Sequence, residues 1–138
     1  MSLHELFGTD KNAEEKGVWV WYGEEEDKAP GFLIARMGKS NKKYSKTLEK
    51  NTRAHRRAIE LETMKEDQAD KIFLKTFCKS VLLDWKNVTT KDGKTLPFST
   101  KNAIELLTDL PDLYDDLNEK ARKATLFREE TQEEDAKN

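Results

Sequence analysis

Cysteine and long hydrophobic runs are what this chain of 138 residues lacks most clearly. With a single cysteine it cannot contain an internal disulfide, so it does not belong to the small disulfide-stapled folds. No apolar run approaches the roughly 18 residues that a membrane-spanning helix needs, and the N-terminus lacks the apolar core of a signal peptide. We therefore expect a cytoplasmic protein with no membrane contact.

Recognisable catalytic patterns are also missing. The sequence contains no glycine-rich phosphate loop, no serine nucleophile elbow and no histidine or cysteine spacing typical of a metal site. The two histidines, His4 and His55, lie far apart in the sequence, and Cys78 lies on the apolar face of a predicted helix, where a small buried hydrophobe is the better interpretation. We expect no enzymatic activity, no metal and no cofactor.

Four aspartates between residues 109 and 116 are the nearest approach to a cation site. Asp109, Asp112, Asp115 and Asp116 do not have the spacing of a calcium-binding loop. Acidic residues in the first turn of a helix are favoured by its dipole, and this explains the cluster better.

An excess of one charge is absent as well. The 25 basic and 27 acidic residues nearly cancel, which argues against a dedicated nucleic-acid binder. Charged residues make up 38% of the chain and apolar ones 36%, so the core should be thin and built mainly from helix faces. The length suits one domain, and we predict a mostly α (α+β) fold of about four helices with an N-terminal β-hairpin. Its expected parts are an N-terminal arm (1–16), a single domain (17–127) that begins with the hairpin (17–37), and an acidic flexible tail (128–138).

Two short stretches predict the hairpin. Residues 17–23 are rich in β-branched and aromatic side chains and are bounded by glycines, and residues 32–36 follow a turn at Pro30-Gly31. Alternation along a strand places Trp19 and Trp21 on one face. Both faces are apolar, so we expect the hairpin to pack on the helices with one side uncovered.

Helical periodicity predicts the remainder of the domain. A long, weakly amphipathic helix should begin near Lys39 and reach Ile59, and a core helix should run from Ile72 to Trp85. The Asp-Gly pair at 92–93 predicts a tight turn. Ser99 is a good N-cap for the next helix, and Pro111 is suited to the first turn of the last one.

Residues 36–57 are strongly basic, with nine basic side chains and one acid. Such a face could follow a phosphate backbone, but aromatic interleaving is limited to Tyr44 and no base-reading motif is present. We therefore favour electrostatic contact with protein over nucleic acid. The residues that we expect to make this contact are Lys46, Lys50, Arg53 and Arg57.

A series of short motifs resembles the tail assembly chaperones of long-tailed bacteriophages and prophages. The resemblance covers about residues 18–128, and its motifs are Phe32–Arg36, Asn41, Tyr44, Leu82–Val88, Asp92-Gly93, Leu96–Ser99, Asn102-Ala103, Leu106-Leu107, Asp109–Leu113 and Leu126–Arg128. It implies a non-enzymatic protein in the cytoplasm of the bacterial host. Its expected client is the tape measure protein, with the tail tube protein as a second partner and self-association as a further property.

A chaperone of this kind must cover the apolar stripe of a helical client reversibly. The candidate surfaces are the uncovered face of the hairpin, with Trp19, Trp21 and Leu33, and any helix groove around Tyr114. Simple core packing is the competing explanation for both tryptophans. Two other functions stay open: a structural tail or head component of the virion, and a nucleic-acid-binding regulator that uses residues 39–57.

Overall fold

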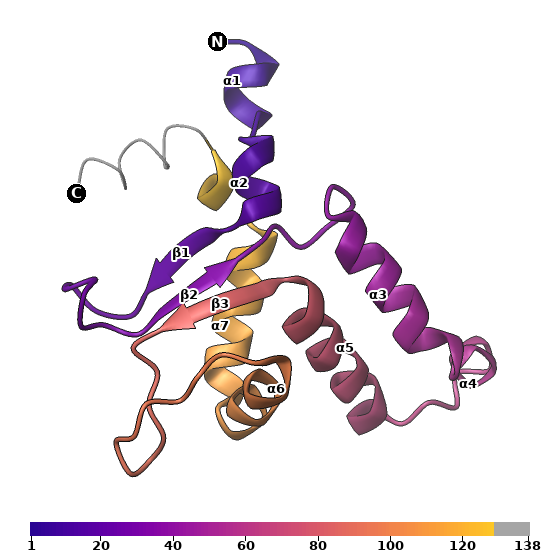
Figure 1. Ribbon diagram of the computed structural model, residues 1–138. Helices are drawn as coiled ribbons and strands as arrows, with labels where there is room; N and C mark the ends of the chain where they lie inside the picture. The colour runs from indigo at the N-terminus through magenta and orange to yellow at the C-terminus, as the bar shows by residue number, and fades with distance from the viewer. Residues whose placement is uncertain (129–138) are drawn as a thin grey trace.

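The structure is a computed structural model, and it describes residues 1–128. In that part of the chain a three-stranded antiparallel sheet packs with one face against helices (Figure 1). The elements are α1 (Leu3–Phe7), α2 (Lys11–Lys16), β1 (Val18–Trp21), β2 (Gly31–Ile34), α3 (Lys42–Arg53), α4 (Arg56–Glu60), α5 (Glu66–Ser80), β3 (Leu82–Lys86), α6 (Thr100–Asp109), α7 (Pro111–Arg122) and the 3₁₀ helix η1 (Ala124–Phe127). None of the helices described is both long and apolar enough to cross a membrane.

The mostly helical α+β class and the N-terminal hairpin are confirmed. Strands β1 and β2 pair antiparallel, with Trp19 opposite Leu33. Four of the described helices, α3, α5, α6 and α7, have ten or more residues. The predicted acidic tail lies outside the described residues, apart from Arg128.

The helix predicted to run from Ile72 to Trp85 is wrong in its last part. Helix α5 ends at Ser80, and residues 82–86 form β3, which pairs antiparallel with β2. The pairing contains a bulge, because Leu33 lies opposite Asp84 while Ile34 lies opposite Leu82. The extra residue, Leu83, lets Leu82 and Trp85 both face the core although they are three positions apart. That spacing is the same as on a helix, which is why the periodicity misled.

The single basic helix that was predicted between Lys39 and Ile59 is also wrong, because it is divided into α3 and α4. Asn51 and Thr52 have low helix propensity, and both use their side chains for other contacts at this point. The Asn51 amide donates to Thr76 Oγ1 (2.9 Å), and the Thr52 hydroxyl donates to the Leu48 carbonyl (2.9 Å). The Asn51 bond attaches the end of α3 to α5, and the chain turns before α4.

The helix starts and the tight turn predicted after residue 90 are confirmed. Ser99 accepts a hydrogen bond from the amide of Asn102 (3.0 Å) at the start of α6, and Pro111 is the first residue of α7. Thr89 and Thr95 form an isolated antiparallel bridge around the predicted tight turn, where Gly93 has φ +81°. A type of turn that requires positive φ favours glycine there.

The main core lies between the inner face of the sheet and the long helices. Its fully buried side chains include Ile34, Phe77, Leu107 and Leu117, which come from β2, α5, α6 and α7. Figure 1 shows α7 behind the sheet and α6 below it, with α5 and α3 to one side. The opposite face of the sheet carries no helix among the elements described, as the hairpin prediction required.

The N-terminal helices differ from each other. Helix α2 contacts η1 through a small cluster of Ala13, Val18 and Phe127, whereas α1 buries no residue. Glu14 of α2 is buried and attaches this region to the linker before α3, where its carboxylate accepts from Ser40 and Arg36.

Candidate partner-binding groove

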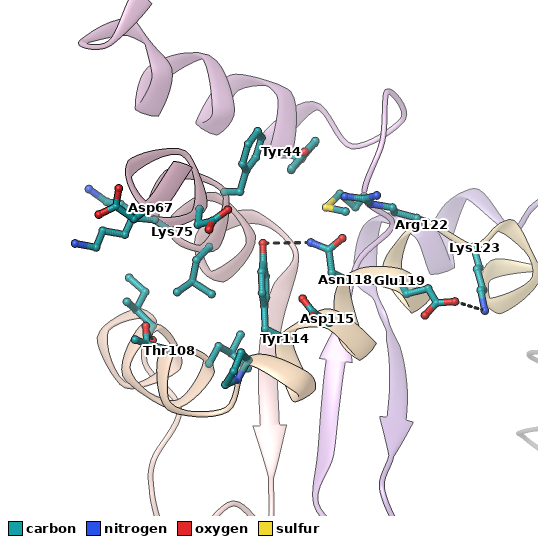
Figure 2. A pocket seen from close by; sticks show the side chains of 18 residues that line it. Tyr44, Asp67, Lys75, Thr108, Tyr114, Asp115, Asn118, Glu119, Arg122 and Lys123 are labelled. Atoms are coloured by element: carbon teal, nitrogen blue, oxygen red, sulfur yellow. Dashed lines mark hydrogen bonds and ion pairs between the residues drawn. The ribbon is translucent and has the colours of Figure 1, made fainter. Parts of the chain in front are cut away.

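A groove of about 1110 Å³ opens between α3, α5, α6 and α7. Figure 2 shows the side chains that line it. They are Met37, Tyr44, Asp67, Asp70, Lys71, Phe73, Leu74, Lys75, Ile104, Leu107, Thr108, Pro111, Tyr114, Asp115, Asn118, Glu119, Arg122 and Lys123.

The floor of the groove is apolar because two helices turn a second apolar position outward beside their buried stripe. On α5, Phe77 is fully buried, while Leu74 is half-buried and lines the groove. On α7, Leu117 faces the core and Tyr114 faces the groove. The floor is thus continuous with the main core, and a partner seated there would extend that core.

Tyr114 lies at the centre of this arrangement. Its ring meets Phe77 edge to face, with centroids 5.4 Å apart and an interplanar angle of 84°. Its hydroxyl accepts a hydrogen bond from the Asn118 amide (3.3 Å). Burial raises the pKa of Tyr114 to about 12, so the phenol is neutral at physiological pH. Tyr114 can therefore offer a flat apolar face and a neutral hydroxyl to a ligand.

The rim of the groove is charged and balanced. Acids are contributed by Asp67 and Asp70 of α5 and by Asp115 and Glu119 of α7, and bases by Lys71, Lys75, Arg122 and Lys123. One pair within the rim, Lys123 Nζ to Glu119 Oε1, is closed at 3.1 Å and is largely exposed. A rim with four charges of each sign selects against no particular net charge of the partner.

The predicted hairpin residues lie elsewhere. Trp19 and Trp21 stack on the outer face of the sheet with centroids 5.3 Å apart, and Leu33 is the β2 partner of Trp19. Tyr114 lies on the side of the sheet that carries the helices. The four predicted partner-binding residues therefore form two separate surfaces.

Two residues that sequence reasoning missed complete the outer face. The Lys86 ammonium lies 4.5 Å from the centroid of the Trp19 ring, a cation–π contact. A Cβ on Gly31 would lie 2.3 Å from a ring carbon of Trp21, so the indole lies directly on this glycine. Gly31, the first residue of β2, was a usable signal for the close approach of Trp21, whereas Lys86 was missed because the residues before it were predicted to be helical.

The predicted basic residues are all exposed. Lys46, Lys50 and Arg53 lie on α3, and Arg57 lies on α4. Arg53 is 3.8 Å from Glu49 in a solvent-exposed ion pair, which stabilises the helix little. In residues 1–128 no ion pair joins these bases to the acids of α7, whose Asp116 and Glu119 pair with Lys120 and Lys123 instead. The basic face is open to a partner.

The described residues show no cluster of three or more histidine, cysteine or acidic side chains that could hold a metal ion. Cys78 is buried, and burial raises its pKa to about 12, so its thiol stays protonated. A protonated, buried thiol is neither a nucleophile nor a ready metal ligand.

The groove residues that sequence reasoning did not single out are mainly Met37, Phe73 and Leu74. Phe73 and Leu74 are adjacent on α5, and only one of two adjacent apolar residues can face the core stripe squarely. Phe73 is 49% exposed, which marks the lip of the groove. Met37 is placed by a backbone bond from its amide to the Ala121 carbonyl (2.8 Å), which periodicity does not reveal.

A family model described as YdaY prophage protein matches residues 39–138. This range contains α3 to α7 and all the groove residues except Met37. No curated protein and no solved structure matches the chain.

Proposed function

Because the chain belongs to the YdaY prophage protein family, we propose that it is a tail assembly chaperone that binds the tape measure protein and keeps it soluble during tail assembly. The motif resemblance between residues 18 and 128 supports this function. The observation that carries it is the groove around Tyr114, whose floor is apolar and whose rim carries both charges.

The groove has the chemistry that an amphipathic helix requires. A client helix would place its apolar stripe on Phe73, Leu74 and Tyr114, with anchors spaced three and four residues apart. The charged flanks of such a helix would meet the four acids and the four bases of the rim, which come from α5, α7 and the residue after α7. A long rod-like client with mixed charges beside its stripe satisfies both conditions.

The expected affinity suits a chaperone that leaves its client. Burying a leucine or phenylalanine side chain contributes about 1.5–3 kcal/mol, so three anchors contribute roughly 5–9 kcal/mol. The costs of association and of ordering side chains reduce this gain, which leaves a dissociation constant on the order of micromolar or weaker. Binding of this strength prevents aggregation yet yields to polymerising tube subunits.

The protein would act by binding alone, without catalysis or a cofactor. The exposed bases Lys46, Lys50, Arg53 and Arg57 would provide a second contact for an acidic segment of the client. Such exposed charges mainly accelerate association, and they do so less at high salt.

Co-expression with the tape measure protein of the same prophage tests the proposal. Light scattering should find the client soluble in a defined complex with this chain and aggregated without it. Phe73→Ser removes a groove side chain that is 49% exposed, so it should weaken the complex at least tenfold without unfolding the domain. Ile59→Ser is the matched control, because Ile59 is 44% exposed but lies on α4, outside the groove. Equal binding by both variants would refute the groove as the client site.

The two other functions predict different results. A structural component would be present in purified virions, which mass spectrometry detects, whereas a chaperone would be absent from them. A nucleic-acid-binding regulator would bind duplex DNA with a steep salt dependence and would lose this binding in Lys46→Glu or Lys50→Glu variants. A client that aggregates in the presence of this chain would sink the chaperone proposal.

A further inference from the structure

Strand β1 is an unprotected sheet edge. The strand order is β1-β2-β3, so β1 has a strand on one side only (Figure 1). Natural edge strands usually carry a lysine, a proline or an inward charge that prevents pairing with another chain. Residues 18–22, Val-Trp-Val-Trp-Tyr, contain none of these.

The register of the hairpin shows which backbone groups point outward. The Tyr22 amide donates to the Pro30 carbonyl (2.8 Å), which marks the pair 22 and 30 as hydrogen-bonded. Hydrogen-bonded and non-hydrogen-bonded pairs alternate along an antiparallel ladder. Val20 opposite Phe32 is therefore hydrogen-bonded, while Trp19 and Trp21 direct their N–H and C=O groups away from β2.

These four backbone groups have no partner among residues 1–128. No hydrogen bond besides the strand ladder involves Trp19 or Trp21 in the part of the chain that the structure describes. Two donors and two acceptors alternate along one uncharged edge, which is the pattern that another antiparallel strand completes.

We propose that β1 pairs with β1 of a second copy of this chain, antiparallel, about a two-fold axis at Val20. Trp19 then lies opposite the partner's Trp21 in a hydrogen-bonded pair, and the reverse pair is made by symmetry. All four outward groups of each copy are paired, and the two sheets join into one six-stranded sheet. The result is an isologous dimer, because the same edge serves both copies.

Neighbouring registers are less favourable. An axis at Trp19 would require the Gly17 amide, which already donates to the Ala13 carbonyl (2.9 Å). An axis at Trp21 would place Trp19 opposite Gly23 of the partner, beyond the end of the strand. The axis at Val20 alone uses the groups that are free.

The tryptophan side chains favour the same arrangement. Trp19 and Trp21 stack on the outer face, and the dimer would bring four such indoles side by side across the seam. Cross-strand aromatic pairs stabilise a sheet by roughly 0.2–1 kcal/mol each. No charged side chain of β1 lies at the seam, so the two copies meet without like-charge repulsion.

The area of the seam sets its strength. A tryptophan buries about 150–250 Å² when it is fully covered, and both indoles are already half-buried, so each copy covers on the order of 200 Å² more. A standard stable interface covers about 800 Å² on each partner. The dimer should therefore be weak and reversible, with a dissociation constant on the order of 100 µM.

Disulfide trapping of Val20→Cys tests the register. Non-hydrogen-bonded antiparallel pairs have Cα atoms about 4.5 Å apart, which is within the range of a disulfide. Mild oxidation of the full chain should thus give a covalent dimer of Val20→Cys. The matched control is Val18→Cys, another buried β1 residue, which would lie opposite the partner's Tyr22 and should not self-link. Equal cross-linking of both variants, or none of either, would overturn the proposal.

Sedimentation at increasing protein concentration distinguishes pairing at the β1 edge from stacking of the outer faces of two sheets. Trp21→Lys should weaken the dimer at least tenfold, because lysine at the edge opposes pairing. Leu33→Lys places the same charge on the same outer face but on the central strand, and should leave the dimer nearly unchanged. Loss of the dimer in Leu33→Lys alone would mean that the sheets stack face to face. A wild-type protein that remains monomeric at millimolar concentration would also refute the proposal. The partner of the β1 edge would then be an extended segment of another protein or of residues 129–138.

Discussion

Replacing Glu14 with glutamine should remove a buried charge that holds the N-terminal region to the domain. The Glu14 carboxylate accepts hydrogen bonds from the hydroxyls of Thr9 (2.5 Å) and Ser40 (3.1 Å), and lies 3.4 Å from Arg36 and Lys11. Its side chain is only 6% exposed, so these contacts are poorly screened. Glu14→Gln keeps the shape and one acceptor but removes the charge.

The expected loss follows from the contacts. A hydrogen bond to a charged group contributes about 1.5–3 kcal/mol, against about 1 kcal/mol for a neutral one. Two such bonds and the weakened pair with Arg36, whose side chain is 22% exposed, make a loss of about 2 kcal/mol reasonable. For a domain of this size that corresponds to a fall in melting temperature of roughly 6–8 °C.

The pH dependence of the unfolding free energy provides a second test of the Glu14 contacts. Burial alone would raise the pKa of Glu14, but the hydrogen bonds from Thr9 and Ser40 and the charge of Lys11 outweigh it and lower the pKa from 4.5. A lowered pKa means that the stabilisation is complete above the unfolded pKa, near 4.5, and is lost as the pH falls through the folded value. The difference between wild type and Glu14→Gln should thus be full at pH 7 and shrink in acid.

Urea unfolding followed by circular dichroism at several pH values measures this difference. Glu15→Gln is the matched control, since Glu15 is the exposed neighbour on the same helix and should cost less than about 0.5 kcal/mol. If the two variants were equally stable at pH 7, or if the loss in Glu14→Gln grew toward low pH, the reasoning would be refuted.

Three other positions give sharp expectations. Gly31→Ala should displace the Trp21 indole, because the new Cβ would lie 2.3 Å from a ring carbon. We expect the free energy of unfolding to fall by about 1–3 kcal/mol and the near-ultraviolet circular dichroism signal to weaken; an unchanged signal would contradict the contact. Asn87 has φ +59°, and its side-chain amide donates a hydrogen bond to the Ala29 carbonyl (2.8 Å). Asn87→Ala should therefore lower the free energy of unfolding in urea by about 2 kcal/mol, and Asn87→Gly should lower it by clearly less; the reverse order would contradict the role of the positive φ. Cys78, with its pKa raised to about 12 by burial, should resist thiol reagents at pH 8 in the folded protein and react once guanidinium unfolds it; prompt labelling of the native state would show that it is accessible.

The local signals of the sequence were reliable where neighbours within one turn decide the structure. The Ser99 cap acts on an amide three residues ahead, and the Pro111 ring acts on the residue before it and on its own turn. The alternation that placed Trp19 and Trp21 on one face of a strand depends only on the backbone of that strand. Each of these predictions needed no knowledge of distant residues.

The prediction for residues 81–85 failed because a distant strand decides their structure. Leu82 and Trp85 have helical spacing, yet Ile34 and Phe32 of β2 pair with them, and the bulge at Leu83 reconciles that spacing with a strand. A bulge depends on the register between two strands that are separated by about fifty residues. Periodicity within one segment contains no information on it.

The candidate site, too, could be predicted only in part from the sequence. Tyr114 was singled out within its predicted helix, but the groove exists only because α3, α5, α6 and α7 meet so that Phe73 and Leu74 stay partly exposed beside it. The open edge of β1 likewise depends on the strand order, since the same residues in the middle of a sheet would have no free amides.

By itself, the sequence determined the mostly helical class, the N-terminal hairpin, the helix ends around residues 99–111 and the basic face of α3, because each follows from composition or from contacts within a few residues. Only the tertiary structure decided that the hairpin gains a third strand, that the tryptophans and Tyr114 lie on separate surfaces, and that a groove and a free edge remain. Both remaining surfaces are set by which elements meet, and that choice is made by the free energy of packing distant residues together rather than by any one segment.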